Sequence, residues 1–218
     1  MTLAIYPSGS VNLLLSLARF DEAIEVGEQL VEQDPLGYIA RVNLALTYIM
    51  GGQFNPAIDL CRQLLDETDQ RGGPCLSALV LGLSYSGQGE AALEALSLAD
   101  SERLHVRLAP RAYLAAGDTQ AFDDSMIALK RRFDSGDTGL ASALARSYAF
   151  SGDHEAALHW LTIAIDNGGT LMAPGLSYYQ SLEDQPEYQA LLLQTGNDQA
   201  QLDQIEFELR ERQHPLLD

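Results

Sequence analysis

The sequence predicts an all-α protein built as a solenoid of about five helix pairs, with further helices covering its C-terminal end. The first observation is a recurring position: Ala23, Ala57, Ala92, Phe122 and Ala157 follow one another at intervals of 34, 35, 30 and 35 residues. The second is a glycine turn ahead of several of these positions, between two apolar segments with helical spacing. A period near 34 residues is typical of stacked helix pairs, because one pair cannot bury its apolar face alone.

The segment 36–69 shows the pattern most completely. In order, it has a small residue, an aromatic residue, a pair of turn glycines, a second aromatic residue and an alanine: Ala45, Tyr48, Gly51-Gly52, Phe54 and Ala57. In this order the chain resembles the tetratricopeptide repeat (TPR) family over residues 7–168. The resemblance implies a right-handed α-α superhelix, whose concave face is lined by the first helix of each pair.

Two other repeats carry features that need separate explanations. Gly87, Gly89 and Ala92 match the G-x-G-x-x-A dinucleotide fingerprint, but that fingerprint needs a preceding strand, and residues 76–85 have a helical pattern. The fourth repeat has Pro110 inside its predicted first helix. The short interval before Phe122 indicates that the second helix of repeat three has lost about one turn.

Residues 169–218 do not form a sixth repeat, and we predict a C-terminal helical cap over the array at 1–168. Leu202, Ile205 and Leu209 have helical spacing and predict an amphipathic helix near the end. An L-x-x-x-P-x-F/Y-x-x-L-L element is formed by Leu182, Pro186, Tyr188, Leu191 and Leu192. In this element the tail resembles the end of TPR regions in bacterial winged-helix transcription activators and adenylate cyclases, whose other parts this chain lacks.

The charge of the chain restricts its partners. It has 31 acidic and 13 basic residues and a net charge of -18. Such a charge repels phosphate backbones and anionic lipids, so neither nucleic-acid binding nor binding to a membrane surface is expected. No signal peptide and no apolar run long enough to cross a bilayer is visible, so no direct membrane insertion is expected. A cytoplasmic location is favoured, and a periplasmic one is left open for a fragment of a membrane-anchored protein.

No pattern in the sequence indicates catalysis, a metal site or a cofactor. His154 and His159 are five residues apart and would diverge on a helix, and no H-E-x-x-H motif is present. Cys61 and Cys75 lack metal-binding or redox spacing. We expect them to be buried free thiols that do not lie across from each other. We therefore expect a protein that is not an enzyme, and an unrecognised pocket in the concave face is the remaining enzymatic alternative.

The TPR resemblance also implies a binding surface. The candidate partner-binding residues on the first helices are Ile39, Val42, Leu46, Ile49, Met50, Leu81, Tyr85, Arg107, Arg111 and Arg146. We expect a partner peptide to seat apolar side chains near residues 39–85 and to place an acidic group or its C-terminal carboxylate at the arginines. Alternatively, the tail, a neighbouring subunit or additional N-terminal sequence covers the apolar strip, and the arginines pair with local carboxylates.

Chaperone-binding TPR proteins use a carboxylate clamp of two lysines, two asparagines and an arginine. Asn12 and Asn43 fall at the asparagine positions, but Ser8, Pro74 and Ala78 occupy the basic ones. Co-chaperone activity of that type is therefore not expected. The sequence predicts a non-enzymatic interaction or scaffold module for a protein or peptide partner, with a homodimer left open. A sensory or regulatory segment of a larger bacterial signalling protein is the alternative.

Overall fold

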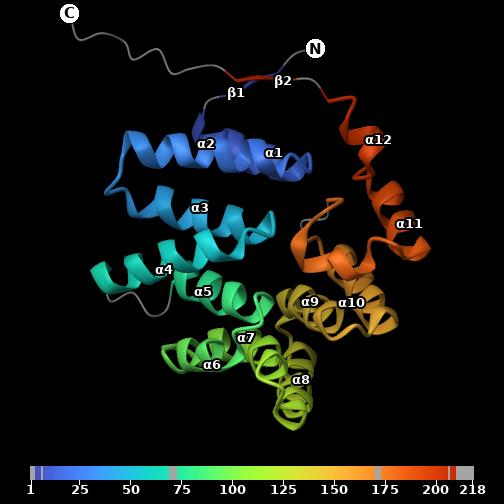
Figure 1. Ribbon diagram of the computed structural model, residues 1–218. Helices are drawn as coiled ribbons and strands as arrows, with labels where there is room; N and C mark the ends of the chain where they lie inside the picture. Colours follow the sequence, from blue (N-terminus) through green and yellow to red (C-terminus); the bar gives the residue numbers. More distant parts are fainter. Residues whose placement is uncertain (1–2, 6, 69–72, 170–172, 206, 210–218) are drawn as a thin grey trace, which may run out of the picture.

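The computed structural model describes residues 3–5, 7–68, 73–169, 173–205 and 207–209. Within these residues, five successive helix pairs make up most of the chain (Figure 1). The pairs are α1 (Pro7–Ser16) with α2 (Phe20–Gln33), α3 (Tyr38–Met50) with α4 (Phe54–Thr68), α5 (Pro74–Tyr85) with α6 (Gly89–Ser97), α7 (Glu102–Ala115) with α8 (Thr119–Asp134), and α9 (Ala141–Ser151) with α10 (His154–Asp166). The predicted all-α solenoid of helix pairs is confirmed.

The pairs stack through two sets of contacts. Each helix packs on the next one along the chain, and the first helix of each pair also packs on the first helix of the following pair. The array therefore runs down one side of the molecule from α1 to α6 and returns on the other side through α8 to α10 (Figure 1). The first helices α3, α5, α7 and α9 are thus joined in one continuous row.

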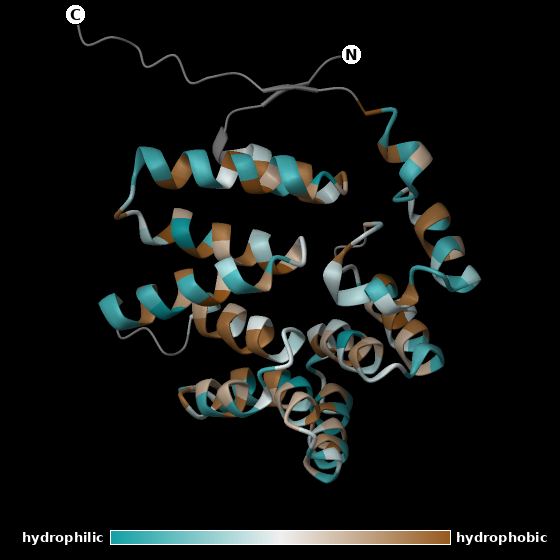
Figure 2. Ribbon diagram, viewed as in Figure 1, coloured by the Kyte–Doolittle hydropathy of each residue, from teal (hydrophilic) through white to brown (hydrophobic). Residues whose placement is uncertain are grey.

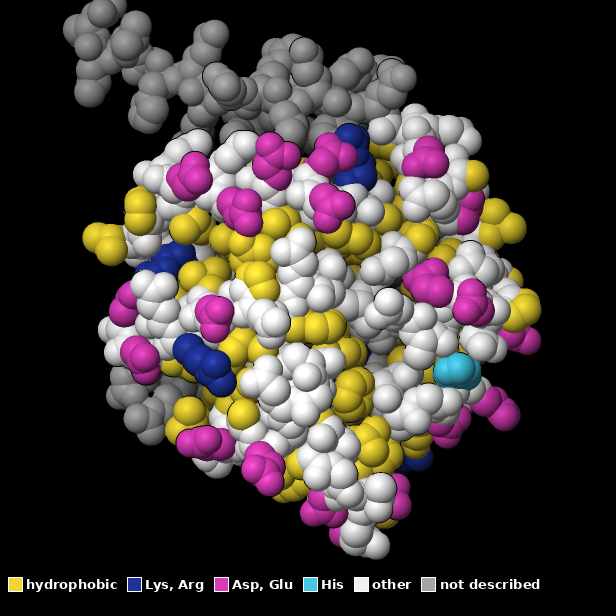
Figure 3. Space-filling view, in the orientation of Figure 1, with side chains coloured by type: hydrophobic (Ala, Val, Ile, Leu, Met, Phe, Trp, Pro, Cys, Tyr) yellow, Lys and Arg dark blue, Asp and Glu magenta, His cyan; other side chains and the backbone are white. Residues whose placement is uncertain are grey.

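The recurring alanines lie in the hydrophobic core of the array. Ala23, Ala57, Ala92 and Ala157 are all completely buried, as is expected where only a methyl group fits between two helices. Phe122 at the equivalent place in repeat four is partly buried against a separate small cluster. Hydrophobic residues of the helices gather toward the inside of the stack, and acidic side chains are spread around the rim (Figures 2 and 3).

The glycines of repeat three have structural roles. The segment before them is helix α5, as predicted, so no strand precedes the fingerprint-like motif. Gly87 has φ +74°, a left-handed conformation that favours glycine at the end of a helix. A Cβ atom on Gly89 would lie 2.3 Å from the backbone of Ala115 in α7. Helix α6 has 9 residues against 14 in α2 and 15 in α4, so the predicted loss of helix length is confirmed.

The C-terminal segment folds back along the array. It consists of the 3-10 helix η2 (Ser177–Leu182), α11 (Pro186–Thr195) and α12 (Gln199–Leu202), and η2 packs on both α9 and α3. Three residues of the predicted terminal element, Leu182, Tyr188 and Leu192, are completely buried. Packing accounts for this element, and the resemblance to signalling proteins stays a prediction, as does the domain boundary at residue 168.

The prediction of an amphipathic helix near the end of the chain is wrong in part. Helix α12 ends at Leu202, and Leu209 lies in strand β2 (Phe207–Leu209). This strand pairs in parallel with β1 (Leu3–Ile5), with Leu3 opposite Phe207 and Ile5 opposite Leu209. The spacing of three apolar residues could not reveal a hydrogen-bonding partner almost the whole chain away. The first and last described elements are therefore side by side (Figure 1).

The expected separation of the two cysteines is also wrong. The Sγ atoms of Cys61 and Cys75 are 2.8 Å apart, and both thiols are buried and free. Helix α5 packs along α4, so its first turn lies beside the middle of α4 rather than beyond its end. The sequence separation of 14 residues gave no indication of that crossing.

Candidate functional site

The predicted partner-binding residues fall into four groups in the structure. Val42, Ile49 and Leu81 belong to the main hydrophobic core and are almost completely buried. They hold α3, α5 and the C-terminal segment together, and they are not open to a partner in this conformation. Ile39 lies at the other extreme, with 68% of its surface exposed near the start of α3.

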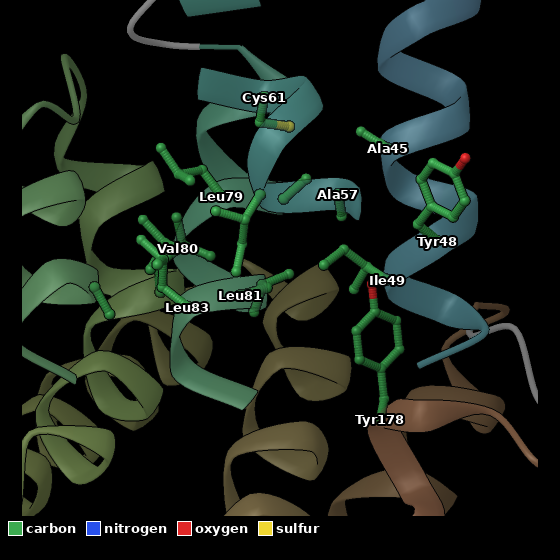
Figure 4. Packing of buried hydrophobic residues seen from close by; sticks show 14 of the residues in the cluster. Ala45, Tyr48, Ile49, Ala57, Cys61, Leu79, Val80, Leu81, Leu83 and Tyr178 are labelled. Atoms are coloured by element: carbon green, nitrogen blue, oxygen red, sulfur yellow. The ribbon is translucent and has the colours of Figure 1, made fainter. Parts of the chain in front are cut away.

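The C-terminal segment covers the middle of the predicted groove. The hydroxyl of Ser177 donates a hydrogen bond to the carbonyl oxygen of Ile49, and Ser181 donates one to the carbonyl oxygen of Ala149. The ring of Tyr178 points from η2 toward Ile49 (Figure 4). For this part of the strip, the alternative in which the tail covers the groove is therefore the one that the structure adopts.

Leu46 and Met50 lie on the N-terminal side of this cover and line an open hollow of about 120 Å³ between α1, α2 and α3. Other helix residues that line it are Val11, Asn12, Leu15, Leu30, Asn43 and Thr47. Asn12 and Asn43 are exposed at its edge. We call this feature the α1–α3 hollow.

Tyr85, Arg107, Arg111 and Arg146 lie on the other side of the cover. Arg107 and Arg111 are one turn apart on α7, and Arg146 comes from α9. The guanidinium group of Arg146 stacks over the ring of Tyr178, 4.4 Å from its centre. Tyr85, at the end of α5, packs edge-on against Phe150 at 4.9 Å. The structure therefore brings together the three arginines that the TPR positions selected, and we call them the arginine cluster.

The arginine cluster is electrostatically unusual because, among the described residues, no carboxylate forms an ion pair with it, and only the more distant Asp137 acts to raise the pKa of Arg107. Burial lowers the pKa of Arg111, and partial burial of the otherwise exposed Arg107, together with the positive charges of Arg111 and Arg146, lowers the pKa of Arg107. Burial also acts to lower the pKa of Arg146, but interactions with Tyr179 and Tyr178 raise it overall. All three groups remain protonated near neutral pH, because arginine titrates far above it.

A second hollow, of about 330 Å³, lies between α7 and α8. Its walls include His105, Tyr113 and Asp124. Sequence reasoning missed it, because the residues that line it include Ala109, Ala121 and Ala128, which are ordinary helix residues and give no sign of a binding site. Among the described residues, no group of three or more His, Cys, Asp or Glu side chains could hold a metal ion. In the same part of the chain, no helix is both long and apolar enough to cross a membrane.

Comparisons with known proteins add little to this description. No family model and no curated protein matches the chain. Among solved structures, MamA AMB-1 is similar, with a TM-score of 0.44, 19% identity, and coverage of 74% of this chain and 91% of that chain. A likeness at this level carries no conclusion about function. The assignment of the fold rests on the helix pairs themselves.

Proposed function

We propose that this protein is a non-enzymatic interaction module that binds an extended peptide segment of a partner protein across α1 and α3. The observation that supports the proposal most directly is the α1–α3 hollow. It is lined mainly by first-helix residues of the first two repeats, and these include Leu46 and Met50, for which the TPR resemblance predicts partner contacts.

The size and lining of the hollow suit one apolar side chain. A volume of about 120 Å³ is close to that of an engineered protein cavity of about 150 Å³ that accepts benzene, so it would hold one leucine or phenylalanine side chain. It is too small for a typical drug-sized ligand, whose sites occupy about 300–1,000 Å³. Leu15, Leu46 and Met50 supply the apolar walls.

The polar edge of the hollow suits a peptide backbone. An asparagine side chain carries both a donor and an acceptor, so it can pair with the N–H and C=O groups of an extended chain. Asn12 and Asn43 lie at this edge, and both are exposed. In the described part of the chain, neither amide has a hydrogen-bond partner among the neighbouring side chains. Apolar side chains would then provide affinity, and the asparagines would orient the bound segment.

The experiment is a selection of phage-displayed peptides on the purified protein, followed by fluorescence anisotropy with the selected sequences. Leu46→Arg should fill the hollow and abolish binding, and Asn43→Ala should weaken binding by about tenfold through the loss of hydrogen bonds to the peptide. Ile39→Arg is the matched control, because it places the same charge on α3 outside the hollow. If no peptide is selected, or if Leu46→Arg binds the selected peptides as tightly as Ile39→Arg, the proposal is wrong.

A further inference from the structure

We propose that the arginine cluster is a binding site for an oxyanion, a carboxylate or phosphate group, held by the guanidinium edges of Arg107, Arg111 and Arg146. The proposal goes beyond peptide binding in the α1–α3 hollow, because it concerns the opposite side of the C-terminal cover. It requires neither a peptide nor a partner protein.

The first support is a set of buried donors without acceptors. Arg111 is only 3% exposed, and among the described residues its Nε and Nη1 atoms have no hydrogen-bond partner of good geometry, although the nearby Tyr85 side chain acts to raise its pKa. The Nε atom of Arg146 is buried and unpaired as well. Arg111 uses only Nη2, which donates to the carbonyl oxygen of Arg107 at 3.0 Å. A buried cation that lacks an acceptor is costly, so an acceptor of opposite charge would be strongly favoured at this place.

The second support is the contrast with other arginines of the same chain. Arg41, which is also buried, binds Glu67 through two hydrogen bonds, and Arg103 on α7 pairs with Asp137. For the arginine cluster, no ion pair with a carboxylate occurs among the described residues. The protein has 31 acidic residues, so a shortage of carboxylates does not explain this.

The third support is the way in which the aromatic residues hold the cluster. Stacking on Tyr178 fixes the plane of the Arg146 guanidinium group, whose buried Nε atom has no hydrogen-bond partner among the described residues. Among the described residues, the buried hydroxyl groups of Tyr85 and Tyr179 make no hydrogen bond of good geometry, although they lie near Arg111 and Arg146. Burial raises the pKa of Tyr85 to about 12, so this hydroxyl keeps its proton at neutral pH and can donate it to an anion.

These groups define the class of ligand. Guanidinium groups only donate hydrogen bonds, and their planar fork matches the two oxygens of a carboxylate or of a phosphate. Arg107 is exposed, so an anion can enter from its side of the cluster. The net charge of -18 opposes the approach of any anion, so binding must come from short-range contacts in the cluster.

The test uses the full chain in a chloride buffer without phosphate or carboxylates. Thermal unfolding is followed by circular dichroism while inorganic phosphate is added in one series and succinate in another, at constant ionic strength set with NaCl. The variants are Arg111→Met and Arg107→Met, of which the second changes an exposed side chain and leaves the core intact. Arg103→Met is the control, because it removes an arginine from the same helix whose charge is already paired.

We expect a saturable rise in Tm of the unmodified protein with at least one of the two anions, because a ligand that binds only the folded state stabilises it. If phosphate raises Tm at a lower concentration than succinate does, the natural ligand carries a phosphate group; if succinate does so, the ligand carries a carboxylate. The rise should vanish in Arg111→Met, need at least tenfold more anion in Arg107→Met, and persist in Arg103→Met. If neither anion gives a saturable rise, or if all the variants respond like the unmodified protein, the proposal is overturned. Neither result bears on the α1–α3 hollow, which contains none of these residues.

Discussion

Replacing Arg111 with methionine should stabilise the protein when no anion is present. In the structure this buried guanidinium group leaves Nε and Nη1 unpaired and makes one hydrogen bond through Nη2. An unsatisfied buried polar group costs about 1–3 kcal/mol, and more when it is charged. Methionine fills much of the same volume, and the substitution gives up one hydrogen bond worth about 1 kcal/mol. We therefore expect Arg111→Met to raise the free energy of unfolding by about 1–4 kcal/mol. Replacing buried ion pairs by well-packed apolar residues has had effects of this size in other proteins.

The assay is urea unfolding followed by circular dichroism in chloride buffer. With an m-value of about 2–3 kcal/mol/M, the midpoint should rise by about 0.3–2 M. Arg41→Met is the comparison, since Arg41 is also buried but is paired with Glu67. Its midpoint should fall, because the substitution removes a charged hydrogen-bond pair. If Arg111→Met lowers the midpoint as much as Arg41→Met does, the unpaired state of the arginine cluster is refuted.

Three further predictions concern other parts of the fold. Gly89→Ala should destabilise the protein by about 2–4 kcal/mol in urea unfolding, because the new methyl group meets the backbone of α7. Gly139→Ala should change stability by less than about 0.5 kcal/mol, because its methyl group would make only an ordinary contact, at 3.8 Å, with the Asp137 side chain. The pKa of Tyr85 is raised to about 12 in the folded protein from about 10 when unfolded, so its neutral form favours folding, and the stability it contributes is lost as pH rises from 10 to 12. Tyr85→Phe should therefore make the loss of stability between pH 10 and 12 less steep, by up to about 1.4 kcal/mol per pH unit. The measurement is urea unfolding at each pH. If the slope is unchanged in the variant, the raised pKa of Tyr85 is contradicted. Cys61 and Cys75 are buried, so both should react with Ellman's reagent only when the chain unfolds, and rapid labelling of the native protein would show that their burial is wrong.

The repeat architecture could be predicted because it depends on local features of the sequence. A fully buried alanine recurs in the second helix of most pairs, so the sequence repeats a small residue at a regular interval. Ala23, Ala57, Ala92 and Ala157 are these alanines. Turn glycines such as Gly87 mark where one helix ends. Each of these features acts within one helix pair, so the sequence of that pair is sufficient to reveal it.

The site could be predicted only in part, because it depends on contacts between distant segments. The positions of Arg107, Arg111 and Arg146 within their repeats indicated a common face, and the structure brings them together. The sequence could not show that η2 would fill the space between the arginine cluster and the α1–α3 hollow. Ser177 contacts Ile49 through a hydroxyl group and a backbone carbonyl, and neither has a sequence pattern that identifies its partner. The predicted single groove is therefore divided into two.

The hydrogen bond between Ser177 and Ile49 joins residues 128 positions apart and has a consequence for how the chain folds. In a plain array each helix pair interacts only with its neighbours, so either end can fray while the rest stays ordered. Here η2 bridges α3 of the second pair and α9 of the fifth. Loosening the second pair therefore also removes one of the contacts that hold the C-terminal segment, which makes unfolding more cooperative. Refolding should end with a slow closing step, because a contact of this span forms only after most of the chain is in place.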